Sequence, residues 1–517
     1  MNTLPSKSIF KRESILLTIL IPVLFFLTCW NLVRYPILSG WDEGIYLQFS
    51  ENLSRYGIYG SIDGDHFHPL LPVGGTGPTL IGTLALAYQI FGESLLVARV
   101  VMAAFLLASV VGFYLLVKEI SRWEIAVAGV FFYLFAGYGS FDTLWIGRQV
   151  LAEIPSYAFL FFGLWLFIQS LRKTGTSRLI ASLVLLGLSV VTKNQFIWVL
   201  TPAFGAMMLI DLVILKQKRW LHFAAATLTL IASYAVWHFG TIFLVKDNYQ
   251  DYQQAQFALL SATFLRWNVF RWVETIKLFI KSGYGLPILL SIAYTLFSIR
   301  KHPEDRLTRG LLLCLDCFGL FSALVLSLPW ARYIYTGIVF ALPLFVLMVH
   351  DHILLVRKTR WLFARYAAFS AVFVMVGFIG VKFIIDTGLI LRSGDQHAIT
   401  FGQQVDQKVP AGELVMNWEW EIEFFSQSTY VHPDYQLFPA MIDQTYNQVD
   451  APILDEPRIP AGVHYVVTGP FAIQTRVFEA ELAARGAECI LQMDAYRLYF
   501  LHSNPSLSGQ PGQTTSP

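Results

Sequence analysis

The sequence predicts a polytopic α-helical membrane protein with a small α/β domain at its C-terminal end. Of its 517 residues, 55% are hydrophobic and only 14% are charged, which is far more apolar than an average soluble domain. Apolar runs long enough to cross a bilayer recur along most of the chain. Lys and Arg lie singly and in short clusters between these runs, a pattern that excludes a nucleic-acid-binding surface.

The apolar runs predict about 11 transmembrane helices. The shortest run, residues 179–191, covers only about 20 Å as a helix. Basic clusters nevertheless flank residues 179–215 on both sides, which favours a hairpin with both ends in the cytoplasm. The longer runs cover residues 14–33, 94–117, 124–141, 154–171, 196–215, 221–245, 278–299, 310–329, 334–356 and 362–385.

The positive-inside rule predicts a multi-pass protein of the plasma (inner) membrane with a cytoplasmic N-terminus. Residues 14–33 follow a short basic segment and precede no small-residue cleavage site, so we expect a retained anchor. The outer face then receives the loop 34–93, the shorter turns near residues 141–153 and 329–333, and everything after residue 385.

Composition divides the chain into three parts. Residues 1–385 form the predicted transmembrane domain. Residues 386–502 are more charged and contain alternating runs such as "VHYVVTG" and a helical "RVFEAELAARG", which predict an extracytoplasmic α/β domain. Residues 503–517 have no core-forming pattern and are expected to be disordered. Cys489 is the only cysteine outside the apolar runs, so no disulfide within this domain is expected.

Two interfacial helices are predicted in the first outer loop. Asp42 can cap the first helix and Gly57 can end it, while Pro78 and Gly92 bracket the second helix. Glu43 suits the first turn of a helix because the helix dipole favours an acid there. Asp42 and Glu43 are therefore either helix-start residues alone or acids of a reaction site.

Further charged residues favour a reaction site. Glu153 follows Arg148 at the outer end of another predicted span, and "TKNQ", with Lys193, lies at the tip of the short hairpin. Polar non-helical backbone at membrane depth is tolerated only where it lines a cavity or is buried in protein. Arg332 lies at a further outer span end, where it either snorkels to lipid headgroups or joins the site.

An outward-facing transferase has no nucleotide sugars, so its donor must cross within the lipid, as a sugar on a polyprenyl phosphate does. Arg and Lys would stabilise the phosphate as it leaves, and Asp42 could take the proton of the attacking hydroxyl. The predicted partners are this donor, an extracytoplasmic acceptor and membrane lipids. A divalent metal is conceivable but not expected.

The motifs "TGPTLIGTLALAYQIFGESLLVARV", "GRQVLAEIP", "LGLSVVTK" and "RYIYTGIVFALP", with the Asp-Glu of the first loop, resemble the dolichyl-phosphate-mannose protein mannosyltransferase family. That family includes the bacterial lipid A aminoarabinose transferases and has the multispanning GT-C glycosyltransferase fold. The resemblance covers roughly residues 15–350 and implies a polyprenyl-phosphate-sugar-dependent transferase.

The resemblance also implies residue roles. Asp42 would be the catalytic base with Glu43 beside it, and Glu153 a second acid that contacts the acceptor or organises the cavity. Arg148 and Lys193 would line the cavity, and Arg332 would bind the donor phosphate. Where aminoarabinose transferases carry a phosphate-binding Lys, this chain has Thr76 before Gly77 and Pro78. Thr76 and the backbone amides of residues 74–77 are then the expected substitutes, as an anion nest.

Three other patterns carry alternatives. His66 and His68 could ligate a metal, but no third ligand is evident, which favours solvated histidines or an acceptor contact. Trp418 and Trp420 could stack on a sugar or, more simply, occupy the buried face of a strand. Asp316 inside a span would need a partner, and Arg309 is the candidate.

The prediction is an inverting glycosyltransferase that acts from a polyprenyl-phosphate carrier on a hydroxyl of a protein, lipid or glycan. A transporter or flippase for a lipid-linked sugar is the alternative, and a glycan receptor is a third hypothesis. A transporter would concentrate polar groups at mid-membrane and often shows repeated halves, whereas this chain places them at one face.

Overall fold

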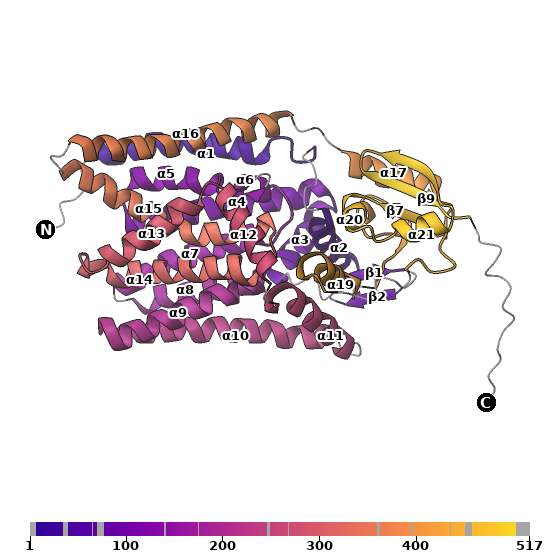
Figure 1. Ribbon diagram of the computed structural model, residues 1–517, viewed down its shortest axis with the longest axis horizontal. Coiled ribbons are helices and arrows are strands. Elements are labelled where there is room, and N and C mark those ends of the chain that lie inside the picture. Colours follow the sequence, from indigo (N-terminus) through magenta and orange to yellow (C-terminus); the bar gives the residue numbers. More distant parts are fainter. Residues whose placement is uncertain are drawn as a thin grey trace.

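The computed structural model contains a helical bundle and a C-terminal domain built on a sheet (Figure 1). It describes residues 7–502 except residues 35–39, 65, 70–76, 139–140, 174, 246–248, 267, 359–361, 393, 395, 435 and 450–457. The long helices run roughly side by side, and the sheet domain lies beyond one end of them (Figure 1). The predicted tail, residues 503–517, and Thr76 lie outside the described residues.

Every predicted apolar run falls wholly or mostly on a helix of the bundle. Among the described residues, six helices are long and apolar enough to cross a membrane, or seven with one bent pair. The chain is thus a multi-pass, mostly helical membrane protein, and the figure of 11 spans stays a prediction. The bundle helices are α1 (Lys7–Cys29), α4 (Leu95–Ile120), α5 (Trp123–Leu134), α7 (Glu153–Arg172), α8 (Thr176–Thr192), α9 (Ile197–Ile210), α10 (Trp220–Val245), α13 (Gly285–Ser298), α14 (Arg306–Phe321), α15 (Ala331–Lys358) and α16 (Leu362–Arg392).

One predicted span contains a sharp bend. Residues 278–299 are not one straight helix, because α12 (Val269–Lys281) and α13 meet at an angle of 91°. The break contains Gly283, which has a φ of 77°, a left-handed backbone conformation that glycine adopts with little strain. α12 itself is amphipathic: it buries Arg271 and exposes apolar side chains such as Val269 and Ile280.

The predicted helices of the first loop are present as α2 (Gly40–Tyr56) and α3 (Pro78–Phe91). α3 begins at its proline and ends before Gly92, as predicted. α2 begins three residues earlier than predicted, so Asp42 and Glu43 lie in its first turn and Asp42 is not the cap. Between the helices, β1 (Gly60–Asp63) and β2 (His66–Pro69) form an antiparallel hairpin.

The C-terminal domain contains a mixed five-stranded sheet in the order β6 (Thr429–Val431), β5 (Leu414–Met416), β7 (Tyr465–Thr468), β9 (Tyr496–Phe500) and β8 (Glu488–Met493). β6, β5 and β7 are parallel, whereas β9 is antiparallel to both of its neighbours. Its helices are α17 (His397–Lys408), α18 (Trp420–Glu423), α19 (Leu437–Ile442), α20 (Pro470–Thr475) and α21 (Glu479–Ala484).

The strand expected around Trp418 and Trp420 stops early. Asn417 ends β5 because its side chain accepts from the Glu419 backbone N–H at 2.9 Å and donates to the Glu419 carbonyl at 3.0 Å. The chain then turns into α18, and both tryptophans are buried without strand alternation. Glu419, between the two tryptophans, and Glu421, after them, are buried as well.

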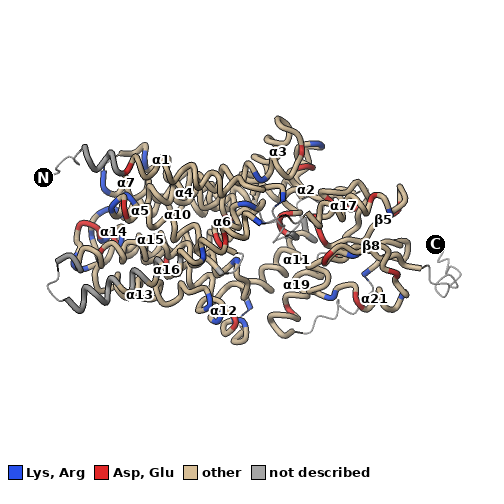
Figure 2. The backbone as a smooth tube through the Cα atoms, turned by 90° about the horizontal axis from the view of Figure 1, so that it is seen from above, with Lys and Arg blue, Asp and Glu red and all other residues tan. Residues whose placement is uncertain are grey.

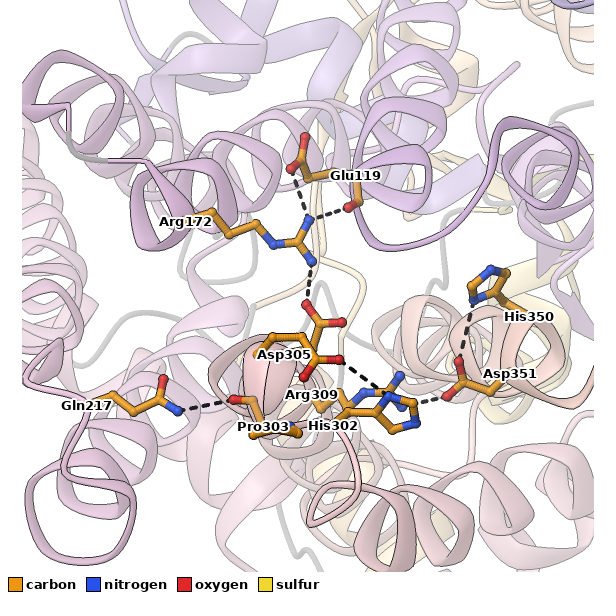
Figure 3. A network of polar contacts seen from close by, with 10 residues as sticks. Glu119, Arg172, Gln217, His302, Pro303, Asp305, Arg309, His350 and Asp351 are labelled. Atoms are coloured by element: carbon orange, nitrogen blue, oxygen red, sulfur yellow. Dashed lines mark hydrogen bonds and ion pairs between the residues drawn. The ribbon is translucent and has the colours of Figure 1, made fainter. Parts of the chain in front are cut away.

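Charged residues gather at two levels of the bundle and in the sheet domain (Figure 2). At the level far from the sheet domain, Arg172 contacts Asp305 at 2.8 Å and Glu119 at 3.1 Å (Figure 3). Arg309 pairs there with Asp351 at 2.6 Å (Figure 3). The expected pairing of Asp316 with Arg309 is therefore wrong, and Asp316 instead accepts from Ser291 at 3.4 Å inside the bundle.

Candidate functional site

Arg332, at the start of α15, binds two carboxylates from distant parts of the chain. Its guanidinium pairs with Asp42 in the first turn of α2 and, through two nitrogens, with Glu153 at the start of α7. The distance from Nη2 to Glu153 Oε2 is 3.0 Å. Glu153 is fully buried, whereas the side chain of Asp42 is 28% exposed. Asp42 is thus the carboxylate of this pair that solvent or a ligand can reach.

Lys193 completes the charged group. Its Nζ lies 2.6 Å from Glu153 Oε1. Lys193 stands in extended backbone, φ −134° and ψ 93°, between the end of α8 and the short helical turn Asn194–Phe196. The break turns its side chain toward α7 and α15. Two acids and two cations from four segments therefore meet at one level, balanced in charge before any ligand binds.

A cavity of about 1290 Å³ opens beside this group, between the bundle and the sheet domain. Asp42, Lys193 and Arg332 line it. Tyr46 and Tyr333 also line it, one turn after Asp42 on α2 and next to Arg332 on α15. Further parts of the wall come from α11 (Tyr249–Leu260), α19, η7 (Asp443–Asn447), α20 and the α18 segment, and from the bundle helices α9 and α10. The volume exceeds the roughly 300–1,000 Å³ of most small-molecule pockets.

Glu43 does not line the cavity, although it neighbours Asp42. Its two oxygens accept from Arg99 at 3.0 and 3.1 Å, and Oε1 also accepts from the Val150 backbone at 3.2 Å. Both side chains of this ion pair are fully buried. Glu43 therefore ties α2 to α4 and to the turn before α7, and it acts on Asp42 by fixing the helix.

Arg148 lies away from the cavity as well. Its guanidinium donates to the carbonyls of Leu27, Thr28 and Trp30 at the end of α1. Those carbonyls have no partner within the helix, and a cation at a helix C-terminus also favours the dipole. Arg148 thus attaches α1 to the turn that leads to Glu153.

The two loop histidines lie on β2. His66 is exposed and pairs in register with Asp63, and His68 is opposite Ser61. Within the part of the chain that the structure describes, no group of three or more His, Cys, Asp or Glu residues is arranged to hold a metal ion.

The sheet domain docks on α2 through a polar group that sequence reasoning missed. Gln48 of α2 donates to Glu423 at 2.5 Å, and Glu423 contacts His432, whose ring stacks on Trp420 at 4.0 Å. Asp63 accepts from the His432 backbone N–H at 3.0 Å. Burial by itself would lower the pKa of His432, but the charges of Glu423 and Asp63 outweigh it and raise the pKa to about 9.

Backbone contact brings α2 still closer to this domain. A Cβ on Gly44 would lie 2.3 Å from the Glu421 backbone nitrogen, so only glycine allows this approach. Gly44 is two residues from Asp42 on α2, and Asp42 and Glu421 line the same cavity. Gly44 and Glu421 are too far apart in sequence for a local pattern to predict their contact. Tyr46, in contrast, could have been predicted as a cavity residue from its helical spacing to Asp42.

Comparisons with known proteins agree with this architecture. Residues 77–238 match the family model of dolichyl-phosphate-mannose-protein mannosyltransferases. The search of curated proteins found no match.

Solved structures share the fold over almost the whole chain. A structure of ArnT from Cupriavidus metallidurans bound to undecaprenyl phosphate has a TM-score of 0.60 at 13% identity, covering 96% of this chain and 99% of that one. The AglB oligosaccharyltransferase of Archaeoglobus fulgidus, in complex with an inhibitory peptide and a dolichol-phosphate, has a TM-score of 0.56 at 12% identity. That match covers 88% of this chain and 69% of AglB.

Proposed function

We propose that this chain transfers a sugar from a polyprenyl-phosphate carrier to an acceptor hydroxyl, because residues 77–238 match the mannosyltransferase family model and the fold is similar to that of ArnT. The observation that carries the proposal is the charged group of Asp42, Glu153, Lys193 and Arg332, here called the Arg332 group. In this group Arg332 holds a reachable carboxylate, Asp42, beside a large cavity. The proteins of similar fold that were solved with undecaprenyl phosphate and dolichol-phosphate support this class of donor.

The proposed reaction is a single in-line displacement. The acceptor oxygen attacks the anomeric carbon, and the bond between that carbon and the phosphate oxygen breaks. The electron pair leaves with the polyprenyl phosphate, and the hydroxyl proton passes to the Asp42 carboxylate. One displacement inverts the anomeric configuration. Phosphate is a good leaving group, so the scheme needs no separate general acid.

Arg332 and Lys193 would bind the donor phosphate in this scheme. Both are cations at the cavity wall, and both are already fixed by Glu153, so little reorganisation is needed as charge develops on the leaving oxygen. The incoming phosphate competes with Asp42 for Arg332, which would release the Asp42 carboxylate for its role as base. Glu153 then acts by positioning the two cations.

The same proposal includes the membrane arrangement. The N-terminus would be cytoplasmic, and the cavity and the sheet domain would face the outside of the plasma (inner) membrane. The basic residues at the far level, such as Arg172 and Arg309, agree with a cytoplasmic position for that level.

Cells that lack the protein provide the test. Mass spectrometry of their polyprenyl-phosphate sugars and envelope glycans should show accumulated donor and missing product. Wild-type protein should reverse both changes, and Asp42→Asn at equal abundance in the membrane should reverse neither. Restoration by Asp42→Asn would contradict the proposal. Movement of a lipid-linked sugar across liposomes without a covalent product would favour a transporter instead.

A further inference from the structure

Glu421 is a buried carboxyl whose hydrogen bonds are incomplete. Its side chain is 1% exposed, and Tyr496 donates to Oε1 at 2.9 Å. Among the residues that the structure describes, Oε2 has no hydrogen-bond partner. An unsatisfied buried oxygen destabilises the folded state, so its retention in a folded protein needs a reason.

The position of Glu421 supplies a reason for keeping this unsatisfied oxygen. It lines the same cavity as Asp42 and Arg332, but from the side of the sheet domain. The close contact of Gly44 with the Glu421 backbone fixes this carboxyl relative to the first turn of α2. Any ligand that fills the cavity from the Arg332 side toward the sheet domain therefore approaches Glu421.

Neighbouring Glu419 has a different role. Its carboxylate accepts from the backbone N–H groups of Gly469 at 2.9 Å, Phe471 at 3.3 Å and Ala472 at 2.7 Å. Glu419 thereby holds the N-terminus of α20 in the cavity wall. The two glutamates of one short segment are thus unlike: one is satisfied by backbone, and the other keeps a free oxygen.

Aromatic rings border the cavity as well. Trp330 and Tyr333 stack at 5.7 Å, and Phe438 and Phe471 lie 6.0 Å apart. All four line the cavity. Aromatic faces beside a few polar groups suit a ligand with both C–H faces and hydroxyls, which is the chemistry of a carbohydrate.

We propose that Glu421 is a carbohydrate-binding residue, whose free Oε2 hydrogen-bonds a sugar hydroxyl on the side of the cavity away from the carrier phosphate. The sugar can belong to the acceptor or to the donor, and the proposal rests on the proposed transferase function. Burial, with the neighbouring charge of Glu419, raises the pKa of Glu421. A neutral carboxyl suits a neutral hydroxyl, because a hydroxyl can both donate and accept.

The test uses the full chain in lipid nanodiscs. Its probes are the lipid-linked sugar fraction and the envelope glycan fraction of cells that lack the protein, both isotopically labelled. Retention of each fraction is measured for wild type, Glu421→Met, Glu421→Gln and Glu488→Met. Glu488 is an exposed carboxyl on β8 of the same domain and serves as the matched control.

We expect Glu421→Met to weaken retention of at least one fraction about tenfold or more, since a sugar hydroxyl loses its partner. Its thermal stability should change little, because removal of the unsatisfied Oε2 offsets the loss of the acceptor for Tyr496. Glu421→Gln should recover most of the retention, and Glu488→Met should match wild type. Loss with the glycan fraction assigns the residue to the acceptor, and loss with the lipid fraction assigns it to the donor sugar.

Unchanged retention by Glu421→Met, or no retention of either fraction by wild type, would overturn the inference. A loss of retention in Glu421→Met that comes with a large drop in unfolding temperature would also overturn it, because that result indicates a structural role. Retention that depends on Glu421, without any sugar transfer by wild type, would keep the carbohydrate site and reject the transferase function. The two proposals therefore fail separately.

Discussion

The helix α7 carries an ion-pair group at each end, and the two groups differ in surroundings. Glu153 at its start joins Arg332, Lys193 and Asp42 beside the large cavity. Arg172 at its end joins Glu119 and Asp305, with side chains 20–32% exposed. The helix of 20 residues separates the two groups by about 30 Å, the thickness of a hydrocarbon core.

The difference shows that ion pairs alone do not mark a site. The Arg172 group links the ends of α4, α7 and α14. The Arg332 group has a fully buried acid that fixes two cations, and an acid that remains reachable. Burying the charge of Glu153 costs free energy of desolvation. A purely structural ion pair has no need to carry that cost beside a cavity large enough for a ligand.

The largest effect is expected from the Arg332 end. Arg332→Ala should lower sugar transfer by about 10²–10³-fold, because it removes a fixed cation from the leaving phosphate. Initial rates per mole of monodisperse protein measure this. Arg332→Lys should retain part of the activity, since it keeps the charge but loses the two-nitrogen contact with Glu153. Activity of Arg332→Ala near that of wild type would remove the distinction between the two ends.

The buried ion pair of Glu43 and Arg99, which does not line the cavity, sharpens the comparison. Glu43→Gln leaves the charge of Arg99 buried without its carboxylate partner and should destabilise the protein by roughly 3–5 kcal/mol. The double variant Glu43→Met with Arg99→Met should recover most of that stability, because neither charge remains. Thermal unfolding in detergent measures both. If Glu43→Gln is as stable as wild type, the assigned clamping role is wrong.

The dock between α2 and the sheet domain should depend on pH. The folded-state pKa of His432, about 9, lies above its ordinary value of 6.5. Its contribution, up to roughly 3 kcal/mol, is therefore complete below about pH 6.5 and is lost as the pH rises through 9. The difference in unfolding temperature between wild type and His432→Gln should shrink from pH 6 to pH 10. A difference that stays constant would contradict the charged pairing with Glu423 and Asp63.

The smallest effect is expected at the far end of α7. Arg172→Gln removes contacts with partly exposed Glu119 and Asp305, which are worth about 0–1 kcal/mol. Transfer activity should remain within about twofold of wild type. A loss comparable to that of Arg332→Ala would mean that the two ends are coupled or equivalent.

Local sequence signals predicted the helices and the charged group. Apolar length located the bundle helices, and proline and glycine located α3. Glu153, Lys193 and Arg332 each stood next to an apolar run, and Asp42 stood in the outer loop after the first run, so one membrane level could be expected for all four.

Long-range packing could not be read in the same way. Glu43 and Arg148 look like site residues because they adjoin Asp42 and Glu153 in sequence, but their side chains point to Arg99 and to the end of α1. No sequence pattern indicated a role for Glu421. Its place at the cavity depends on how the C-terminal sheet domain, hundreds of residues away in the chain, docks on Gly44. The early end of β5 was missed because a side-chain turn at Asn417 overrode the strand pattern.

The most direct measurement compares two aspartates of similar exposure. The side chains of Asp42 and Asp305 are 28% and 32% exposed, and each pairs with an arginine at one end of the bundle. Asp42→Asn and Asp305→Asn, both folded and reconstituted at equal amounts, are assayed for the initial rate of sugar transfer. We expect Asp42→Asn to be slower than wild type by about 10²–10⁴-fold and Asp305→Asn to be within twofold of it. Equal rates for the two variants would contradict the assignment of Asp42 as the base.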